Sequence, residues 1–305
     1  MIPKGAHTVR VMGGIPIRLN IKTESILYLV VLPLGMGVAG NLRRFVLLGV
    51  LVVGMICLAE LPLSLKDQEG EEYYIRVGVL MIVYPDNWNK VGVPIELGQI
   101  EEVLKQIIAD IPCDCLSFSG GLDSSLLLYF MLEAGKKVRV FTITCSDNHP
   151  DIHYSLRVIN YFKNKYKVNI EGSWIVLNNV IGDELVKAFY QNGIAQHTDS
   201  IIAGDGIDEF MAGYYNHQRN PTEETYYDYI RRLQVEQLIP LNENSGEIKV
   251  YLPYLDPHLT SLLWQIPLSE KVDKRTRKKI MMELARGKLP REVIERRKYG
   301  FGTAP

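Results

Sequence analysis

The stretch SFSGGLDSS at residues 117–125 joins an apolar run, CDCLSF at residues 113–118, to the helix-like run LLLYFMLEAG at residues 126–135. Gly120 and Gly121 allow backbone turns that other residues avoid, and they let a ligand approach the main chain. A helix that begins after such a turn directs its unpaired N–H groups back at it, which creates an anion site. The stretch therefore predicts a strand, an anion-binding turn and a helix.

The remaining residues of the turn indicate which anion it binds. Ser119, Ser124 and Ser125 add hydroxyl donors, whereas Asp123 would repel a bare phosphate. An acid in a phosphate cradle is favourable when Mg²⁺ lies between the two. The chain contains no Walker pattern GxxxxGK[ST]. A serine-capped helix after a glycine turn would explain SGG alone, but the complete SGGLDSS after an apolar strand favours a nucleotide site.

Composition excludes some classes of function. The 305 residues suit one large domain or two smaller ones, and a net charge of −1 creates no overall field that favours nucleic acid. Basic residues concentrate at residues 271–279 (KVDKRTRKK) and 291–298 (REVIERRK). Such runs are usually solvated helix faces, but beside an ATP site they would meet phosphates. The four cysteines show no disulfide or zinc spacing, so we expect a reducing cytoplasm, with Cys113 and Cys115 as buried thiols.

The N-terminal region differs in composition from the rest. Residues 26–40 and 45–59 are charge-free runs of 15 residues, each shorter than the ~20 residues of a membrane-spanning helix. Buried core, an interfacial hairpin, a membrane anchor within residues 26–65 and a start codon placed too early all remain open. GMGVAG at residues 35–40 matches a dinucleotide motif, but Pro33 interrupts the strand that should precede it, which favours glycines used for packing.

From about residue 73, strand-like and helix-like segments alternate. Strands are expected at residues 73–84, 114–118, 138–144, 173–177 and 199–204, and helices at residues 98–110, 122–133, 152–166 and 181–191. Such alternation predicts an α/β fold, a parallel sheet with helices on both faces. We expect an apolar N-terminal extension at residues 1–70, a linker or strand region at 71–95 and an ATP-binding domain at 96–305.

A second motif follows the last of these strands. Ligands of parallel sheets bind beyond the carboxyl ends of the strands, and the strand at residues 199–204 runs into GDGIDEF at residues 204–210. Alone, this motif would indicate a turn with a capped helix. Together with SGGLDSS, it offers a second carboxylate to hold Mg²⁺ opposite Asp123 and another acid to serve as a base.

The order of four motifs narrows the function. SGGLDSS, AGDGIDEFMAGY, LPYLDPHL and KLPREVIERRKYGFG, in this order, resemble the synthetase domain of asparagine synthetases, which are PP-loop ATP pyrophosphatases. The resemblance runs from near Glu96 to Pro305 and implies the adenine nucleotide alpha hydrolase-like fold. It also implies a two-step reaction. The side-chain carboxylate of aspartate attacks the α-phosphorus of ATP and releases pyrophosphate; ammonia then attacks the acyl-adenylate and releases AMP.

The resemblance also implies roles for particular residues. Asp205 matches an acid important for adenylation and for ammonia attack, and Lys278 matches a lysine that faces the phosphates. Asp123 and Asp208 would bind Mg²⁺. Contacts to ATP and pyrophosphate would come from Phe118, Ser119, Gly120, Gly121, Asp123, Ser124, Ser125, Ile143, Ala203 and Gly204.

The chain departs from the family at several points. Tyr251 and Met282 stand where the family has arginines. The segment between residues 215 and 250 is shorter than is usual in the family. These departures leave the identity of the carboxylate substrate open. Glutamine-dependent members begin with a catalytic cysteine and a glutaminase domain, whereas this chain begins Met-Ile-Pro and has too few residues before 96 for one. We therefore expect free ammonia or a separate glutaminase subunit as the nitrogen source. A homo-oligomer, another PP-loop ligase for a different carboxylate, and a non-catalytic nucleotide-binding protein remain alternatives.

Overall fold

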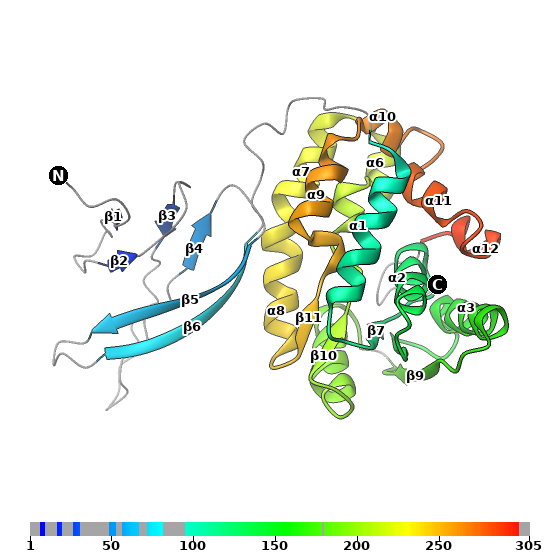
Figure 1. Cartoon of the computed structure of the whole chain (residues 1–305), viewed down its shortest axis with the longest axis horizontal. Coiled ribbons are helices and arrows are strands. Elements are labelled where there is room, and N and C mark those ends of the chain that lie inside the picture. Colours follow the sequence, from blue (N-terminus) through cyan, green and yellow to red (C-terminus); the bar gives the residue numbers. More distant parts are fainter. Residues whose placement is uncertain are drawn as a thin grey trace. The chain divides into compact units, whose positions relative to one another are not determined.

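The computed structural model describes the backbone of short strands near the N-terminus, and the backbone and side chains of residues 95–178 and 180–298 (Figure 1). The chain divides into two units, Met1–Trp88 and Asn89–Pro305. All the motifs of the proposed ATP site fall in the second unit. The GMGVAG segment lies outside the described residues.

The described part of the first unit consists of paired strands. They are β1 (His7–Val9), β2 (Ile17–Leu19), β3 (Leu27–Val30), β4 (Gly49–Val52), β5 (Cys57–Lys66) and β6 (Glu72–Met81). Each pairs antiparallel with its neighbour in sequence, and β3 and β4 bring the two apolar runs together. In the longest pair, Cys57 lies opposite Met81 and Lys66 opposite Glu72. Among the described residues, no helix combines the length and the apolar character needed to cross a membrane.

The second unit is built on a parallel sheet, as predicted. Its strands are β7 (Cys115–Ser117), β8 (Arg139–Thr144), β9 (Glu171–Val176), β10 (Ser200–Ile202) and β11 (Lys249–Tyr251), in the spatial order β11-β10-β7-β8-β9. Every pairing between them is parallel. The chain starts at β7, moves outward to β9, then returns to β10 on the other side of β7. Because the direction reverses between β7 and β10, their carboxyl ends form the crevice where such sheets bind ligands.

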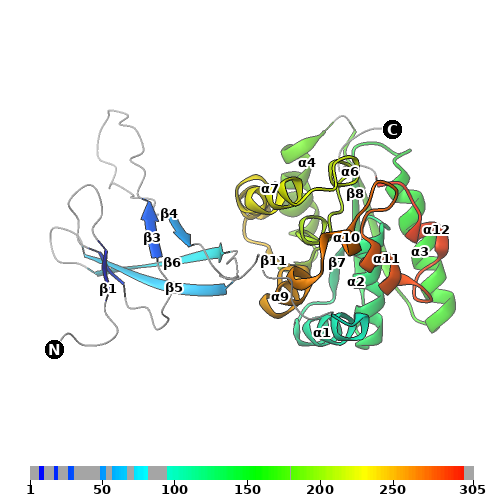
Figure 2. The same cartoon turned by 90° about the horizontal axis from the view of Figure 1, so that it is seen from above.

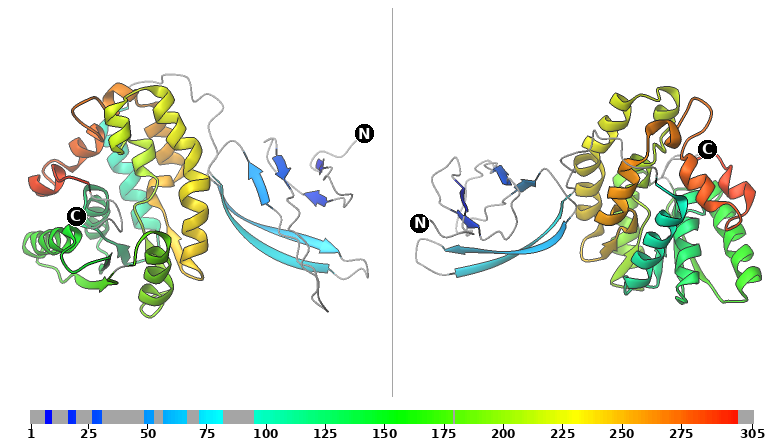
Figure 3. Two further views of the ribbon diagram at one scale, coloured as in Figure 1. Left: turned by 180° about the vertical axis from the view of Figure 1, so that it is seen from behind. Right: turned by 45° about the horizontal axis from the view of Figure 1, so that its top comes forward.

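Helices cover both faces of this sheet. They are α1 (Leu97–Asp110), α2 (Leu122–Glu133), α3 (Pro150–Tyr166), α4 (Gly182–Ala188), α5 (Ile207–Phe210), α6 (Tyr215–Arg219), α7 (Glu223–Leu233), α8 (Ile239–Ser245), α9 (Pro257–Gln265), α10 (Leu268–Lys271), α11 (Lys279–Ala285) and α12 (Arg291–Ile294). Because strand crossovers are right-handed, α2 and α3 cover one face, and α4 and α7 cover the other (Figure 2). Wider π-helical turns, η1 (Phe189–Ile194) and η2 (Gln234–Leu238), and the 3₁₀ turn η3 (Pro253–Leu255) complete the set. Helix α7, η2 and α8 form one continuous helical segment (Figure 3).

Helix α2 is the central helix of the unit. It is apolar on all sides, and Leu126, Leu127, Leu128 and Phe130 are fully buried. A helix of this kind must be covered on every face, and α2 contacts β7, α1 and α11. Each such side chain contributes about 1.5–3 kcal/mol when it leaves water. Strand β7 and helix α2 are therefore both fixed by the core, and the turn between them is held in place from both ends.

The glycines of the two turns are required by geometry. Gly120 has a φ of +64°, and a Cβ there would collide with the backbone of Tyr154 and Ser155 in α3. Gly206 has a φ of +90°, and a Cβ there would collide with the side chain of Leu255. Both positions therefore need glycine for its backbone conformation and for close packing.

We predict that Gly120→Ala destabilises the protein more than Gly135→Ala. Gly135 also has a positive φ, +73°, but nothing lies within 4 Å of its Cβ position. Gly135→Ala should therefore cost only the left-handed backbone penalty of roughly 1–2 kcal/mol. Gly120→Ala should cost a further 1–3 kcal/mol or so, the usual range for overpacking. Urea unfolding of both variants tests this; equal losses would show that α3 does not confine the turn.

Candidate functional site

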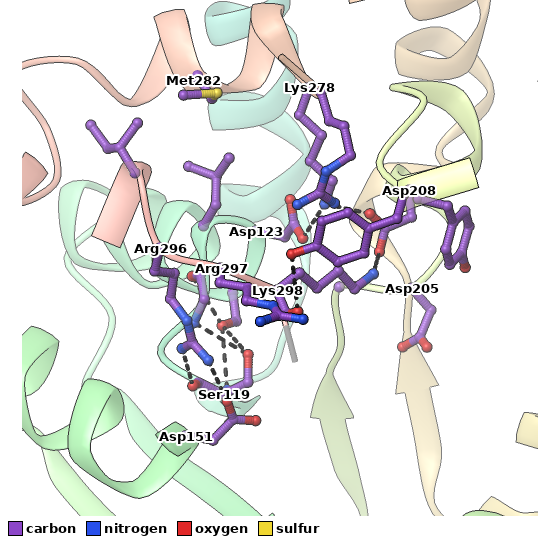
Figure 4. Close-up of a pocket in the computed structure, with 18 of the residues that line it drawn as sticks. Ser119, Asp123, Asp151, Asp205, Asp208, Lys278, Met282, Arg296, Arg297 and Lys298 are labelled. Atoms are coloured by element: carbon purple, nitrogen blue, oxygen red, sulfur yellow. Dashed lines mark hydrogen bonds and ion pairs between the residues drawn. The ribbon is translucent and has the colours of Figure 1, made fainter. Parts of the chain in front are cut away.

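A pocket of about 760 Å³ lies at the carboxyl ends of β7 and β10, where the chain reverses direction (Figure 4). This volume is in the range of small-molecule sites. The lining includes the turn after β7, the turn and first helix after β10, the basic loop before α11, and the residues after α12. The two motifs predicted to form one site are thus brought together.

The turn after β7 is held by its own serines. The Ser119 hydroxyl accepts from the Gly121 N–H at 3.2 Å and lies 3.2 Å from the Ser124 hydroxyl. Ser124 Oγ also accepts from the Ser119 N–H at 3.4 Å. The first N–H groups of a helix have no partner within the helix, and α2 begins here with Gly121 as its N-cap. Hydroxyls and helix N–H groups therefore converge on one wall of the pocket, as an anion site requires.

A buried lysine joins the two turns. Lys278 Nζ lies 2.5 Å from Asp123 Oδ2 and 2.6 Å from Asp208 Oδ1 (Figure 4). Its side chain is only 8% exposed. Lys298 Nζ contacts the other oxygen of Asp208. Two cations therefore meet two carboxylates at the centre of the pocket, and Lys278 bridges the carboxylates.

This arrangement sets the ionisation of the cluster. Burial by itself raises the pKa of Asp208, but the charges of Lys278 and Lys298 outweigh it and bring the pKa well below its usual range. Burial likewise lowers the pKa of Lys278, but Asp123 and Asp208 raise it above the usual value. Asp208 is thus a carboxylate and Lys278 an ammonium at neutral pH. The Lys278 ammonium can therefore pair with a charged phosphate, and the Asp208 carboxylate can pair with a cation.

The backbone positions Lys278 at some cost. Lys278 is the N-cap of α11 and has a φ of +52°, a left-handed conformation that is unfavourable for lysine. Gly213 makes room for its side chain, since a Cβ there would collide with Asp208 and with Lys278 Cε. Arg277 donates to the Gly213 carbonyl on the same side. Strain of this kind is concentrated at functional sites, where it fixes a side chain for its task.

The family-specific motifs support the turn from outside. Tyr254 of the LPYLDPHL motif donates to the main-chain carbonyl of Asp123 at 2.9 Å. Asp256 of the same motif caps α9 by accepting from the His258 N–H at 2.8 Å. Asp256 is therefore a helix cap, and this motif supports the pocket through the hydrogen bond of Tyr254.

Arg296 supports the opposite side of the turn. It donates to the Ser119 carbonyl at 3.1 Å and pairs with Asp151 at 2.5 Å, and the pair is more than 90% buried. Its guanidinium also lies 4.2 Å from the centre of the Tyr154 ring. These contacts attach the last described segment of the chain to the turn after β7.

Asp205 lies apart from the lysine cluster. It lines the pocket, but its carboxylate points away from Lys278 and Asp208 (Figure 4). Burial raises its pKa, and the nearby charge of Asp208 adds to the rise. A raised pKa makes the carboxylate a stronger proton acceptor than an ordinary aspartate.

Most of the predicted site residues line one pocket: Phe118, Ser119, Gly121, Asp123, Ser124, Ile143, Gly204, Asp205, Asp208 and Lys278. Three others lie behind its surface. Gly120 packs against α3, Ser125 is fully buried in α2, and Ala203 is buried and donates its N–H to the Tyr251 carbonyl at 2.9 Å. These three residues therefore support the wall of the pocket from behind.

Sequence reasoning missed several residues of the site. Arg275, Arg277, Arg296, Arg297 and Lys298 line the pocket, together with Asp151, Glu209, Tyr214 and Gln237. The two basic runs were interpreted first as solvated helix faces, but residues 272–278 and 296–298 are not helical. The other interpretation of these runs, that they contact the phosphates of an ATP site, was the sequence signal that pointed to these arginines and Lys298. Glu209 and Tyr214 lie within the AGDGIDEFMAGY motif but were not singled out, and Gln237 carried no such signal.

The carboxylates fit a magnesium ion. Asp123 Oδ1 is buried and has no hydrogen-bond partner among the described residues, and Asp208 Oδ1 is paired with the Lys278 ammonium at 2.6 Å. Because one ammonium reaches both side chains, one cation can bridge them. Carboxylate oxygens are the ligands Mg²⁺ prefers, and in nucleotide sites it takes one or two of them with phosphates and water. The described residues contain no cluster of three or more metal-ligating side chains, so the remaining ligands would come from phosphate and water.

Glu209 forms a separate acidic group in the same pocket. It is fully buried, and burial is the main reason that its pKa rises to about 7. Its neighbours are Tyr214, which donates to it at 2.6 Å, and the charges of Asp208 and Lys298. A carboxyl of this kind changes charge within the physiological range.

Comparison with known proteins gives one clear match. The sequence model of the family described as asparagine synthase matches residues 100–251 and 244–305. No curated protein matches the chain. Among solved structures, 59 chains match. One of them is the structure of NMN synthetase from Francisella tularensis, whose sequence is 13% identical to this one. The match covers 67% of this chain and 75% of that chain, with a low TM-score of 0.32.

We predict a pH-dependent stability difference between the wild type and Glu209→Gln. The folded pKa of Glu209, about 7, exceeds its ordinary value of 4.5, so its stabilising contribution is complete below pH 4.5 and is lost as pH rises to 7. Glutamine does not titrate. The wild type's stability relative to the variant should therefore fall by about 3 kcal/mol across this window.

Urea unfolding of both proteins between pH 4.5 and 7.5 measures this difference. The two proteins are compared because His217 also makes the stability depend on pH: burial lowers its pKa to about 4. Its contribution is present above pH 6.5 and is lost as pH falls, the opposite trend. It is the same in both proteins and cancels in the difference. A difference that stays constant with pH would contradict the prediction.

Proposed function

Because this chain belongs to the asparagine synthase family of ATP-dependent ligases, we propose that it forms an amide from a carboxylate, ATP and ammonia, with aspartate as the carboxylate. Adenylation would activate the carboxylate, and ammonia would complete the amide. The observation that carries the proposal is the Lys278 bridge between Asp123 and Asp208, next to the serine-rich turn. A buried cation, two carboxylates and helix N–H groups in one pocket match the needs of phosphoryl chemistry.

ATP would bind with its polyphosphate against the turn after β7. The N–H groups at the start of α2 and the hydroxyls of Ser119 and Ser124 would contact the two terminal phosphates. Phe118, Ile143 and Gly204 line the same pocket and would contact the adenosine. Asp123 and Asp208 would hold Mg²⁺, which neutralises charge on the departing pyrophosphate when it is bound.

In the first half-reaction, an oxygen of the carboxylate substrate attacks the α-phosphorus of ATP. A new O–P bond forms, the bond to the β-phosphate oxygen breaks, and pyrophosphate leaves with the electron pair. Negative charge increases on the leaving group, and Lys278 and Lys298 lie where they would stabilise it. Lys278 would then release one or both of its carboxylates and contact phosphate, which offers the ammonium an equivalent partner.

In the second half-reaction, ammonia attacks the carbonyl carbon of the acyl-adenylate. The C–N bond forms, AMP leaves as its oxyanion, and the nitrogen must lose a proton. Asp205 is the proposed acceptor, because it lines the pocket and burial raises its pKa, which makes its carboxylate a stronger base. The described cysteines, Cys113, Cys115 and Cys145, are buried and do not line the pocket. We propose that the nitrogen arrives as free ammonia or from a glutaminase subunit.

A second candidate keeps the chemistry and changes the carboxylate. Met282 lines the pocket at a position where the resemblance places an arginine, and Gln237 enters the pocket from the segment that is shorter than in the family. Both features change the lining of the pocket relative to the family's pattern. A non-catalytic nucleotide-binding protein is disfavoured, because the turn, both carboxylates and the lysine all meet in one place.

Exchange of labelled pyrophosphate into ATP tests the proposed function. Aspartate should support exchange in the presence of Mg²⁺, and omission of the carboxylate should abolish it. Amide should then form with ammonium salts, at a rate that rises with pH as NH₃ replaces NH₄⁺. If other carboxylates support exchange and aspartate does not, the second candidate holds; if none does, the ligase proposal fails.

We predict that Lys278→Met slows pyrophosphate exchange by roughly 10²- to 10³-fold, the loss caused by removing one preorganised electrostatic group. Lys279→Met is the matched control. Lys279 is adjacent, but it pairs with Asp273 at 2.6 Å and is partly exposed. Its replacement should leave exchange unchanged. A loss confined to the ammonia step in Lys278→Met would mean that the lysine does not serve the phosphates.

A further inference from the structure

Two cysteines lie side by side at the amino end of β7, the end opposite the pocket. Cys113 and Cys115 are free thiols, only 6% and 2% exposed, which confirms the expectation that both are buried. The Cys115 N–H donates to Cys113 Sγ at 3.4 Å, and Cys113 Sγ donates to the Cys115 carbonyl at 3.6 Å. Each cysteine therefore has the other as a neighbour, which a disulfide requires.

The surroundings favour the charged form of Cys115. Arg139 on β8 is its register partner, and Arg139 Nη2 donates to Cys115 Sγ at 3.3 Å. A hydrogen bond from the Cys113 thiol is the main reason that the pKa of Cys115 is lowered to about 6; Thr198 and the charge of Arg139 contribute, and burial opposes the fall. The same hydrogen bond raises the pKa of Cys113. At neutral pH, Cys115 is thus a thiolate, the reactive form of cysteine, while Cys113 keeps its proton.

The pair lies close to the surface of the second unit. Pro112 and Asp114, the residues on either side of Cys113, are exposed. A reagent of a few atoms therefore has a short path to the two sulfur atoms. Cys145, by contrast, follows the last residue of β8 and lies at the other end of the parallel sheet.

A disulfide between Cys113 and Cys115 would change the backbone at Asp114. The two Cα atoms of a disulfide are usually about 4.4–6.8 Å apart, whereas residues two apart in an extended chain are separated by roughly 6.6–7.2 Å. The chain would therefore bend at Asp114, which precedes the strand. The Asp114 carbonyl accepts from the Arg139 N–H at 2.9 Å, so the bend would disturb the pairing of β7 with β8.

Strand β7 connects this change to the pocket. It contains only Cys115–Ser117, and Phe118 and Ser119 follow it directly into the anion-binding turn. The Phe118 N–H continues the pairing by donating to the Phe141 carbonyl at 2.8 Å. Packed interiors transmit strain, and a strand of three residues has little length in which to absorb it. A shift at Cys115 would therefore reach the turn.

We propose that Cys113 and Cys115 form a redox-active dithiol, which a hydroperoxide oxidises to an intramolecular disulfide, and that this disulfide loosens the turn after β7. The dithiol lies at the opposite end of β7 from the proposed ligase reaction and takes no part in it. A small thiol would reduce the disulfide again by thiol–disulfide exchange, so the modification is reversible.

The oxidation proceeds in two steps. The Cys115 thiolate attacks one oxygen of the hydroperoxide; an S–O bond forms, the O–O bond breaks, and the other oxygen leaves with the electron pair and takes up a proton. Cys115 is then a sulfenic acid. Cys113 loses its proton and attacks the Cys115 sulfur; the S–S bond forms, the S–O bond breaks, and the departing hydroxide takes the proton to leave as water. Two thiols are oxidised, and the hydroperoxide is reduced to water or an alcohol.

Mass spectrometry of the complete chain after treatment with hydrogen peroxide tests the first part. Trypsin releases residues 106–136 as one peptide, whose two cysteines are Cys113 and Cys115. After free thiols are alkylated, this peptide should be unmodified and lighter by two hydrogen atoms, and dithiothreitol should reverse the change. Cys145, in the peptide of residues 140–157, should still be alkylated. A 106–136 peptide alkylated on both cysteines, or oxidation of all three cysteines at one rate, would overturn the proposal.

Single substitutions assign the two roles. In Cys113→Ser, the sulfenic acid at Cys115 has no thiol to attack it and should be trapped by dimedone, whereas Cys115→Ser should give no adduct at Cys113. Arg139→Met should slow sulfenylation roughly 10-fold, the change in thiolate fraction that one pKa unit produces. Cys145→Ser is the matched control and should form the disulfide at the wild-type rate. A dimedone adduct on Cys113 in place of Cys115 would contradict the assignment.

Amide hydrogen exchange of residues 116–121 tests the second part without relying on ligase activity. Protection of these amides should fall roughly 10-fold in the oxidised wild type relative to the reduced protein, because a strained disulfide favours local opening. Peroxide-treated Cys113→Ser, which cannot form the disulfide, should retain the protection of its untreated form. Equal protection in oxidised and reduced wild type would show that the disulfide does not reach the turn, and the second part would be wrong.

Discussion

The structure depends on one interaction, the bridge that Lys278 forms between Asp123 and Asp208. It joins three segments: the turn after β7, the first helix after β10 and the loop before α11. Breaking one side of it would leave a buried carboxylate or ammonium without a counter-charge, which is costly inside a protein. The open strand order brings the two turns to one crevice, and the lysine makes them one site.

The pocket has two chemically different sides. Around the turn after β7, cations, hydroxyls and helix N–H groups provide for an anion. Around Glu209, an unpartnered carboxylate oxygen and an aromatic face provide for a cation. The left-handed backbone at Lys278 and the π-helical turn at Gln237 each bring one side chain into the pocket.

Much of the second unit could be predicted from the sequence. The helix at residues 122–133 was predicted with the bounds it has, and the strands at 115–117 and 139–144 were predicted to within two residues. Strand β11 was missed, because three residues are too few to show a period; its pairing with β10 makes it a strand. The helix predicted at residues 181–191 divides into α4 and η1, since the pattern of apolar residues does not distinguish an α turn from a π turn.

The sequence by itself determined the two turns, because their chemistry is local. Gly120 and Gly206 are needed for backbone conformations that no neighbouring segment can supply, and the serines and acids follow them within a few residues. The order of the motifs matched Lys278 to the site, but only the tertiary structure decided which carboxylates it bridges and that Gln237 reaches the same pocket. Lys278 meets a carboxylate 155 positions away, and Gln237 meets one 28 positions away. Such contacts are set by how the sheet and its helices pack, and this packing leaves no periodic or local signal along the chain.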